Sequence, residues 1–218
     1  MPDFKGRLIA FDVETGGFSS EKNPLCDIAL VAFDPFTDSI LDTYQGFIKP
    51  YMPSQAYTGG AMKVNGLSLP FLEQNGKDIA VVMKEVSDFI RNNEVKVPRR
   101  TIKPQLVGHN VEFDLGFLEA NMTRCGLDLY DIIHPIIHCT MLQMQIGFPR
   151  AEMIANHKLG TCTEYFGIEL EDAHSALPDT IATAKLAMAL MFNRDKVTSN
   201  TSDDSEQKGR KFCKRFRF

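Results

Sequence analysis

The sequence has little that would point to a secreted or membrane protein. Its five cysteines are an odd number at irregular spacings, and none of them forms a Cys-x-x-Cys pair. We therefore expect free thiols in a reducing compartment, because neither a disulfide framework nor a zinc site has a recognisable spacing. No apolar run approaches the length of a membrane span, and residues 1–5 lack the apolar core of a signal peptide. These absences predict a cytoplasmic protein with no membrane contact.

The size and charge of the chain suggest one folded domain and a separate tail. Its 218 residues are enough for an α/β domain with a substantial core. The formal net charge is −4, but residues 196–218 carry seven Lys or Arg and three Asp or Glu, which leaves residues 1–195 near −8. Carboxylates gathered around divalent metal ions would account for several of those negative charges. We expect the functional domain at 1–195 and a flexible polar linker with a basic-aromatic tail at 196–218.

Hydrophobic patterning predicts strands first and alternating helices and strands afterwards. Apolar runs at 8–13 and 28–33, followed by a third strand at about 39–48, indicate a β-meander. Further along, we expect strands at 105–108 and within 132–137, and helices at 78–90, 112–125, 139–147, 158–166 and 175–193. This order predicts an α/β fold in which a mixed sheet, a three-strand meander plus parallel strands, has helices on both faces.

Two acidic residues stand where the first predicted strand ends. Asp12 and Glu14 are two positions apart, so in a strand both carboxylates project from the same face. Ligands of open α/β sheets tend to bind at this carboxyl edge. Two carboxylates there repel each other unless a cation lies between them, and oxygen ligands favour Mg²⁺ or Mn²⁺. Taken alone, the pair could equally be two solvated acids at a strand end.

Two further segments place acids at the starts of predicted helices. Asp114 follows the strand at 105–108 and begins the next helix, where an acid also complements the helix dipole. His174 and Asp179 are five positions apart around the start of the last helix, with Pro178 tolerated in its first turn. Either segment alone could be an ordinary helix start.

Together and in order, the three segments resemble the motifs of the DnaQ-like DEDD 3′–5′ exonucleases of the RNase H-like superfamily, in the subgroup with histidine in the last motif. Residues 11–17, 109–114 and 174–179 match the three motifs, and the resemblance spans about 7–193. Within this family, the motif sequences are most similar to those of RNase T and of the proofreading subunit of bacterial replicative polymerase. One departure is His138-Cys139-Thr140, where relatives often carry Asp-Thr at a position that is not a metal ligand.

The resemblance implies an RNase H-like exonuclease that hydrolyses phosphodiester bonds at single-stranded 3′ ends and releases nucleoside 5′-monophosphates. Asp12, Glu14, Asp114 and Asp179 would hold two Mg²⁺, for which Mn²⁺ could substitute, on either side of the scissile phosphate. His174, neutral near pH 7, would take the proton of the attacking water as general base.

The resemblance also implies contacts with the terminal nucleotide. Thr15 and Gly16 would let it approach the backbone closely. Leu67, in a Val-Asn-Gly-Leu stretch that relatives place near the substrate terminus, would pack against its sugar or base. Phe113 would do the same, although a core role for this residue is equally compatible with the sequence.

The partners and the biological role are left open by the sequence. The expected substrates are single-stranded DNA or RNA 3′ ends, and a homodimer or a polymerase or replication partner is compatible with the family. The alternatives are a proofreading subunit, an RNase T-like RNA trimmer, or an inactive nucleic-acid-binding module, against which the complete set of four carboxylates and one histidine argues. Basic residues at 96–103 could contact phosphates or form a solvated loop. The tail could stack on unpaired bases or dock on a protein.

Overall fold

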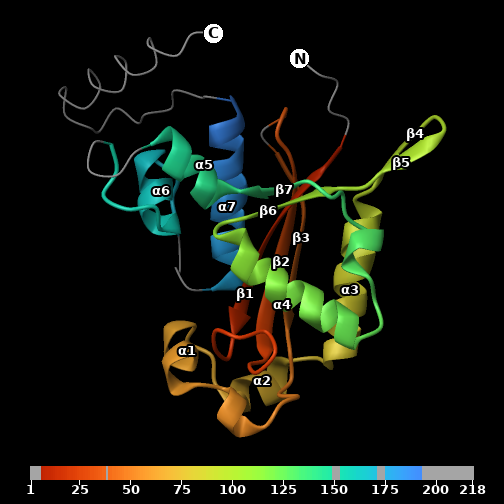
Figure 1. Cartoon of the computed structure of the whole chain (residues 1–218), viewed down its shortest axis with the longest axis vertical. Helices are drawn as coiled ribbons and strands as arrows, with labels where there is room; N and C mark the ends of the chain where they lie inside the picture. The colour runs from red at the N-terminus through yellow and green to blue at the C-terminus, as the bar shows by residue number, and fades with distance from the viewer. Residues whose placement is uncertain (1–5, 38, 149–152, 171–174, 193–218) are drawn as a thin grey trace.

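The structure is a computed structural model that describes residues 6–37, 39–148, 153–170 and 175–192 (Figure 1). The predicted linker and tail at 196–218 lie outside the described residues. The strands are β1 (Leu8–Thr15), β2 (Leu25–Asp34), β3 (Ser39–Phe47), β4 (Val95–Val97), β5 (Arg100–Ile102), β6 (Gln105–Gly108) and β7 (Ile137–Cys139). The α-helices are α1 (Gly59–Val64), α2 (Leu69–Asn75), α3 (Ile79–Asn92), α4 (Val111–Arg124), α5 (Thr140–Gly147), α6 (Leu159–Tyr165) and α7 (Ala176–Phe192), and short 3-10 helices cover Ser54–Ala56 and Leu129–Asp131.

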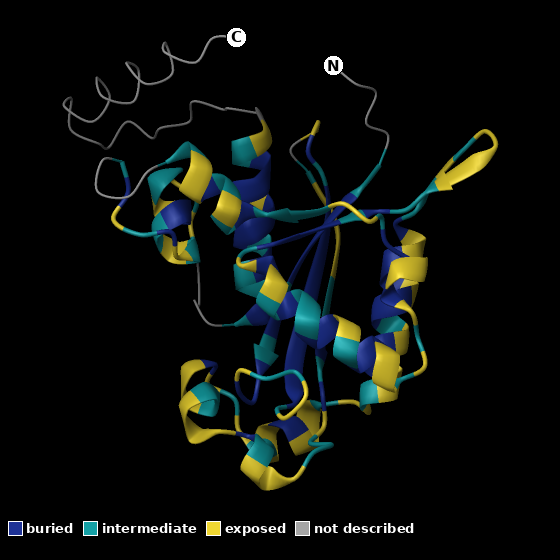
Figure 2. Ribbon diagram, in the orientation of Figure 1, coloured by how far each residue is buried: buried dark blue, intermediate teal, exposed yellow. Residues whose placement is uncertain are grey.

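A five-stranded mixed sheet forms the centre of the described structure. Its strand order is β3-β2-β1-β6-β7, in which β1, β2 and β3 are antiparallel and β6 and β7 run parallel to β1. The long strands β1 and β2 are almost entirely buried, because both of their faces are covered (Figure 2). The sequence-based prediction of a three-strand meander joined to parallel strands is confirmed.

Alternation along β1 sends its side chains into two separate hydrophobic layers. Ile9, Phe11 and Val13 pack with the buried faces of α3 and α4. Leu8 and Ala10 point to the opposite face, where small residues of α7 such as Ala184 cover them closely. Helices α5 and α6 pack in turn on α7, on the outside of that layer (Figure 1). Helices therefore flank both faces, as predicted, and Asp12 and Glu14 share the α7 face.

One predicted strand was placed too early in the chain. The apolar residues at 132–137 predicted a strand there, but Ile132 and Ile133 instead donate backbone hydrogen bonds to Leu129 at the end of a 3-10 turn. Both isoleucines are buried in the core beside α4, which accounts for the apolar run. Pro135 has no N–H for a ladder. The strand β7 begins only at Ile137.

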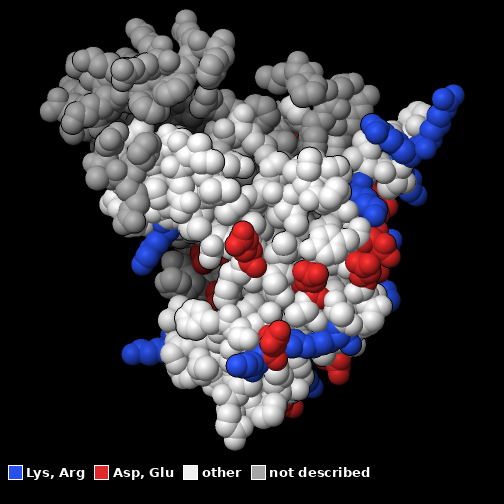
Figure 3. Space-filling view, in the orientation of Figure 1, with Lys and Arg blue, Asp and Glu red and all other residues white. Residues whose placement is uncertain are grey.

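Residues 54–75 and 95–102 form helices and strands that were not predicted from the sequence. The first segment forms α1 and α2, which are capped by Thr58 and Ser68 side chains. The second, the expected basic loop, is a two-stranded hairpin of β4 and β5 that projects from the molecule with its Lys and Arg side chains exposed (Figures 1 and 3). Its turn contains Arg99, whose φ of 72° lies in the left-handed region.

None of the described helices is both long enough and apolar enough to cross a membrane.

Candidate active site

The site forms where β1 continues past the end of its parallel neighbour. The pairing of β6 with β1 ends at Val107, opposite Ala10, whereas β1 runs on to Thr15. Beyond that point, one edge of β1 has no neighbouring strand in the part of the chain that the structure describes. The chain turns sharply at Asn110, which adopts a left-handed φ of 64°, and α4 then begins at Val111. This turn brings the first turn of α4 against the open edge of β1.

Asp114 fills the open edge with a side-chain acceptor. Its Oδ1 accepts the backbone N–H of Val13 at 3.2 Å, in place of a strand carbonyl. The residue is 4% exposed, so its carboxyl group is fixed between α4 and the strand that carries Asp12 and Glu14. Burial raises the pKa of Asp114 to about 7, although the hydrogen bond from Val13 opposes the shift.

Asp179 approaches the same strand from the opposite helix. It lies in the first turn of α7, and its N–H donates to the carbonyl of Ser175 at 3.2 Å. Buried small residues at the start of this helix, including Ala176 and Thr180, allow α7 to lie close to β1 and β2. Helix and strand therefore contribute carboxylates to one point.

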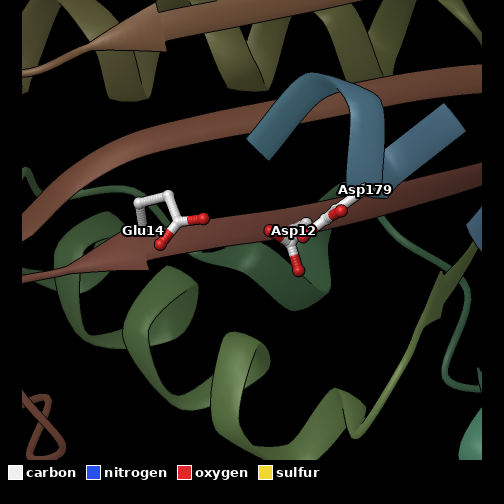
Figure 4. Close-up of side chains that lie close together, drawn as sticks. All are labelled: Asp12, Glu14 and Asp179. Atoms are coloured by element: carbon white, nitrogen blue, oxygen red, sulfur yellow. The ribbon is translucent and has the colours of Figure 1, made fainter. Parts of the chain in front are cut away.

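Asp12, Glu14 and Asp179 meet closely enough to share a cation. Each offers a carboxylate oxygen, and these three oxygens lie within 4.8 Å of one another. Figure 4 shows the side chains of Asp12 and Asp179 directed toward each other between β1 and α7, with Glu14 farther along the strand. In the space-filling view, acidic atoms lie inside a hollow between α1 and the α5–α6 region (Figure 3).

Burial and the repulsion between neighbouring charges both disfavour the ionised forms of these carboxylates in the absence of a cation. The pKa of Asp12 is raised well above its ordinary value, first by burial and then by the charge of Asp114 and its other acidic neighbours. The pKa of Glu14 is raised to about 8 by burial and by the charges of Asp179, Asp27 and Asp114, in that order. Carboxylates so arranged bind protons or a positive ion, and three oxygen donors suit a hard divalent cation. The residues present therefore fit the metal that the sequence predicted.

The predicted general base lies outside the described residues. It is His174, and the first described residue after it is Ser175, four residues before Asp179. The other histidine of the motifs, His109, has a structural contact: its two ring nitrogens are hydrogen-bonded to the hydroxyl of Thr140 and the carbonyl of His157, each at 2.9 Å.

Thr15 and Gly16 are committed to contacts within the protein. The hydroxyl of Thr15 donates to the carbonyl of Gly17 at 2.6 Å, and its own carbonyl accepts from Asn65 at 3.1 Å. A Cβ at Gly16 would stand 2.8 Å from the ring of Pro24. The glycine is thus required for packing of the loop after β1, independently of any substrate. Their predicted role in nucleotide binding stays a prediction.

Phe113 lies between the core and an aromatic residue that the sequence reading missed. Its ring contacts buried Phe117 on one side, with centroids 5.1 Å apart, and the edge of Phe18 on the other, at 6.5 Å. Phe18 is 89% exposed, which is unusual for a large apolar side chain. An aromatic residue directly after Gly16 and Gly17 was a signal that could have revealed it.

Leu67 packs within the protein. It is partly buried against a small cluster around Tyr57 and Leu72, and its N–H donates to the side chain of Asn65.

A separate open groove lies at the start of α4. It has a volume of about 610 Å³, and its lining includes Asn110, Gln145 and Lys158. The groove therefore adjoins the start of the helix that carries Asp114.

A second missed residue is Asp27 on β2. The predicted strand at 28–33 began one residue after it, whereas β2 starts at Leu25 and includes it. Asp27 is 1% exposed and pairs directly across from Glu14. A single acid within an apolar run was the available signal.

Comparison with known proteins places the chain among nucleases. A family model described as "Exonuclease" (RNase_T) matches residues 9–187. The chain is 32% identical over 187 residues to the DNA polymerase III PolC-type of Streptococcus pyogenes serotype M5 (strain Manfredo), and 32% identical over 178 residues to that of serotype M1. These matches cover 86% and 82% of this chain but only 11% of each polymerase.

Solved structures of exonuclease I share the fold. One structure of exonuclease I, solved to explain its processivity, has a TM-score of 0.68 and 20% sequence identity. The match covers 88% of this chain and 42% of that one. The E. coli enzyme in complex with a dT13 oligonucleotide has a TM-score of 0.68 and 19% identity, covering 87% and 41%. Exonuclease I from Methylocaldum szegediense has a TM-score of 0.67 at 19% identity, covering 87% and 41%. The chain spans less than half the length of these proteins.

Proposed function

The chain belongs to this exonuclease family, and from that premise we propose that it is a divalent-metal-dependent enzyme that removes nucleotides one at a time from single-stranded 3′ ends. The observation that carries the proposal is the meeting of Asp12, Glu14 and Asp179 within 4.8 Å at the end of β1. Three acids from a strand and a helix on one face of the sheet repel each other without a cation, and a phosphodiester is a substrate whose charge such a cation would neutralise.

The residues would divide the reaction among them. Asp12, Glu14, Asp114 and Asp179 would hold two Mg²⁺, which when bound neutralise the phosphate and make a water molecule a stronger nucleophile. His174 would accept the proton of that water at a ring nitrogen as the water oxygen attacks phosphorus. The bond from phosphorus to the 3′-oxygen of the preceding nucleotide would break, that oxygen would take a proton from solvent, and a nucleoside 5′-monophosphate would be released. Asp114 keeps its place through the N–H of Val13, so that a bound strand would meet a preformed site.

An exposed aromatic ring and an open groove on the molecule suit a single strand. The exposed ring of Phe18, supported by Phe113, offers a flat apolar surface on which an unpaired base could stack. The groove that begins at Asn110 carries Lys158, whose charge would favour a phosphate of the same strand. Exonuclease I, which shares the fold, has been crystallised with single DNA strands.

Degradation of end-labelled strands tests the proposal. A strand labelled at its 5′ end should shorten in single-nucleotide steps, and a strand labelled at its 3′ end should lose its label as a mononucleotide at once. Single-stranded DNA, single-stranded RNA and a blunt duplex, compared at equal concentration, would show the substrate class. Asp179→Asn serves as the inactive control. Internal cleavage, or loss of label from the 5′ end, would contradict the proposed direction.

A proofreading role is the second candidate, because the similarity to PolC-type polymerases covers more than four-fifths of this chain. A proofreading exonuclease should remove a mismatched primer terminus faster than a matched one, since the mismatched end is more often single-stranded. Equal rates on both termini, with faster degradation of free single strands, would favour an enzyme that acts without a polymerase. A homodimer, a polymerase partner and a cytoplasmic location stay predictions.

A further inference from the structure

Asp27 is an acidic residue on the same face of the sheet as Asp12 and Glu14, and it belongs to none of the three motifs. The β1–β2 register places it directly opposite Glu14 on the neighbouring antiparallel strand. Opposed residues of an antiparallel pair project from the same face of the sheet with closely spaced Cβ atoms. Asp27 therefore points to the α7 side of the sheet, the side of Asp12 and Glu14. The residue is 1% exposed, so water does not screen its carboxylate from theirs.

The contacts of Asp27 hold it in place but leave one oxygen unmatched. Gln45 of β3 donates from its Nε2 to the Oδ2 of Asp27 at 2.7 Å. The buried Oδ1 has no hydrogen-bond partner of normal geometry among the described residues, although the backbone N–H of Ile28 lies close enough to the carboxyl group to interact with it. A buried carboxylate oxygen without a donor is costly, and such groups in native proteins commonly lie near a cation or take part in function. The unmatched oxygen belongs to a residue that faces the acidic cluster.

The position of Asp27 brings its negative charge close to the proposed metal ligands. It lies opposite Glu14 and on the same face of the sheet as Asp12, both of which would hold the cation. Carboxylates so placed on neighbouring strands repel one another. The same repulsion becomes an attraction for a cation placed among the carboxylates.

We propose that Asp27 is a positioning residue of the metal centre, whose fixed negative charge beside Glu14 raises the affinity of the cluster for a divalent cation. Gln45 orients the carboxylate toward that role by binding one of its oxygens. The inference rests on the proposed function, because it assumes that Asp12, Glu14 and Asp179 hold the cation.

Binding of Mn²⁺ to the full chain, measured by calorimetry without nucleic acid at about pH 8, tests the inference. Asp27→Asn removes the charge, preserves the size of the side chain and keeps an oxygen that can accept from Gln45. We expect its Kd for Mn²⁺ to rise about tenfold, which corresponds to about 1.4 kcal/mol. Melting in EDTA should occur at the same temperature as for the wild type or higher, because a repulsive charge has been removed.

Asp34→Asn is the matched control. Asp34 ends the same strand, carries the same charge, and accepts a backbone N–H from Phe36 that asparagine can also satisfy. It lies at the opposite end of β2, more than a Debye length from the cluster in physiological salt, so its substitution should leave the Kd within about twofold. Glu14→Gln is the reference for loss of a direct ligand.

The possible outcomes distinguish failure of the inference about Asp27 from failure of the proposed metal site. If Glu14→Gln abolishes binding while Asp27→Asn binds Mn²⁺ like the wild type, the inference about Asp27 is wrong and the metal site stands. A lower melting temperature of Asp27→Asn in EDTA, or failure to fold, would assign the residue a structural role and also overturn the inference. Unchanged binding in both variants would refute the proposed metal site itself.

Discussion

Substitution of Asp12 by asparagine should make the metal-free protein more stable while it removes activity. Asp12 is the acid whose pKa is raised by the largest number of the surrounding carboxylates, namely Asp114, Glu14, Asp179 and Asp27. Asparagine has nearly the same shape, so the change removes charge with little effect on packing. Stability and activity should therefore move in opposite directions, which is the signature of a functional cluster.

The magnitude follows from the separation of the charges. Two full charges 4.8 Å apart repel by about 3.5 kcal/mol at an effective dielectric constant of about 20. Protons bound to the cluster relieve much of this repulsion, so about 1–2 kcal/mol is a reasonable net gain for Asp12→Asn. For a domain of this size, each kcal/mol shifts the melting temperature by roughly 2–4 °C. We expect a rise of about 2–8 °C in EDTA.

Thermal melts with and without Mg²⁺ provide the assay. At a Mg²⁺ concentration of about 100 times its Kd, the wild type should gain about 2.7 kcal/mol and melt at a clearly higher temperature. Asp12→Asn should lose most of this gain. The difference between the two melting temperatures, with the variant higher in EDTA, should therefore shrink or change sign when Mg²⁺ is added. A variant that melts below the wild type in EDTA would refute the reasoning, because the acidic cluster would then stabilise the fold without metal.

Three further predictions concern the base, the pH dependence and the exposed aromatic. His174→Ala should lose about 10²–10⁴-fold in kcat while it still binds Mn²⁺, and its pH–rate profile should lack the ascending limb; a near-native rate at neutral pH would contradict the role of the base. Because the folded-state pKa of Glu14 is raised from 4.5 to about 8, melts in EDTA should show stability falling as pH rises through that window, and saturating Mg²⁺ should abolish the decline. Phe18→Ala should raise KM for single strands by about 5–150-fold, from the loss of roughly 1–3 kcal/mol of stacking, with kcat changed far less; an unchanged KM would exclude stacking on this ring.

The strands of the meander and the common face of Asp12 and Glu14 could be predicted because each depends on local sequence. Most residues of β1 and β2 are apolar, since α3 and α4 cover one face and α7 covers the other, and such runs are recognisable without tertiary information. Asp12 and Glu14 stand two apart in the first of them, so their common face follows from strand geometry alone. The helix predicted at 158–166 corresponds to α6, which is followed by Gly167 at a φ of 65°.

Other features depend on contacts between distant segments. The apolar residues Ile132 and Ile133 are buried by packing against α4, and local sequence could not distinguish that burial from a strand. Asp114 owes its position to the early end of β6, which leaves the N–H of Val13 open. The role inferred for Asp27 depends on the register of β2 against β1, which no spacing along the chain reveals.

Release of a labelled mononucleotide from the 3′ end of a single strand, followed over time with Mg²⁺ and again in excess EDTA, tests the central claim most directly. The account predicts stepwise release with the metal, none in EDTA, and none with Mg²⁺ in a well-folded Asp12→Asn protein. Hydrolysis at an undiminished rate in EDTA, or by Asp12→Asn, would show that the acidic cluster at the end of β1 does not carry the reaction.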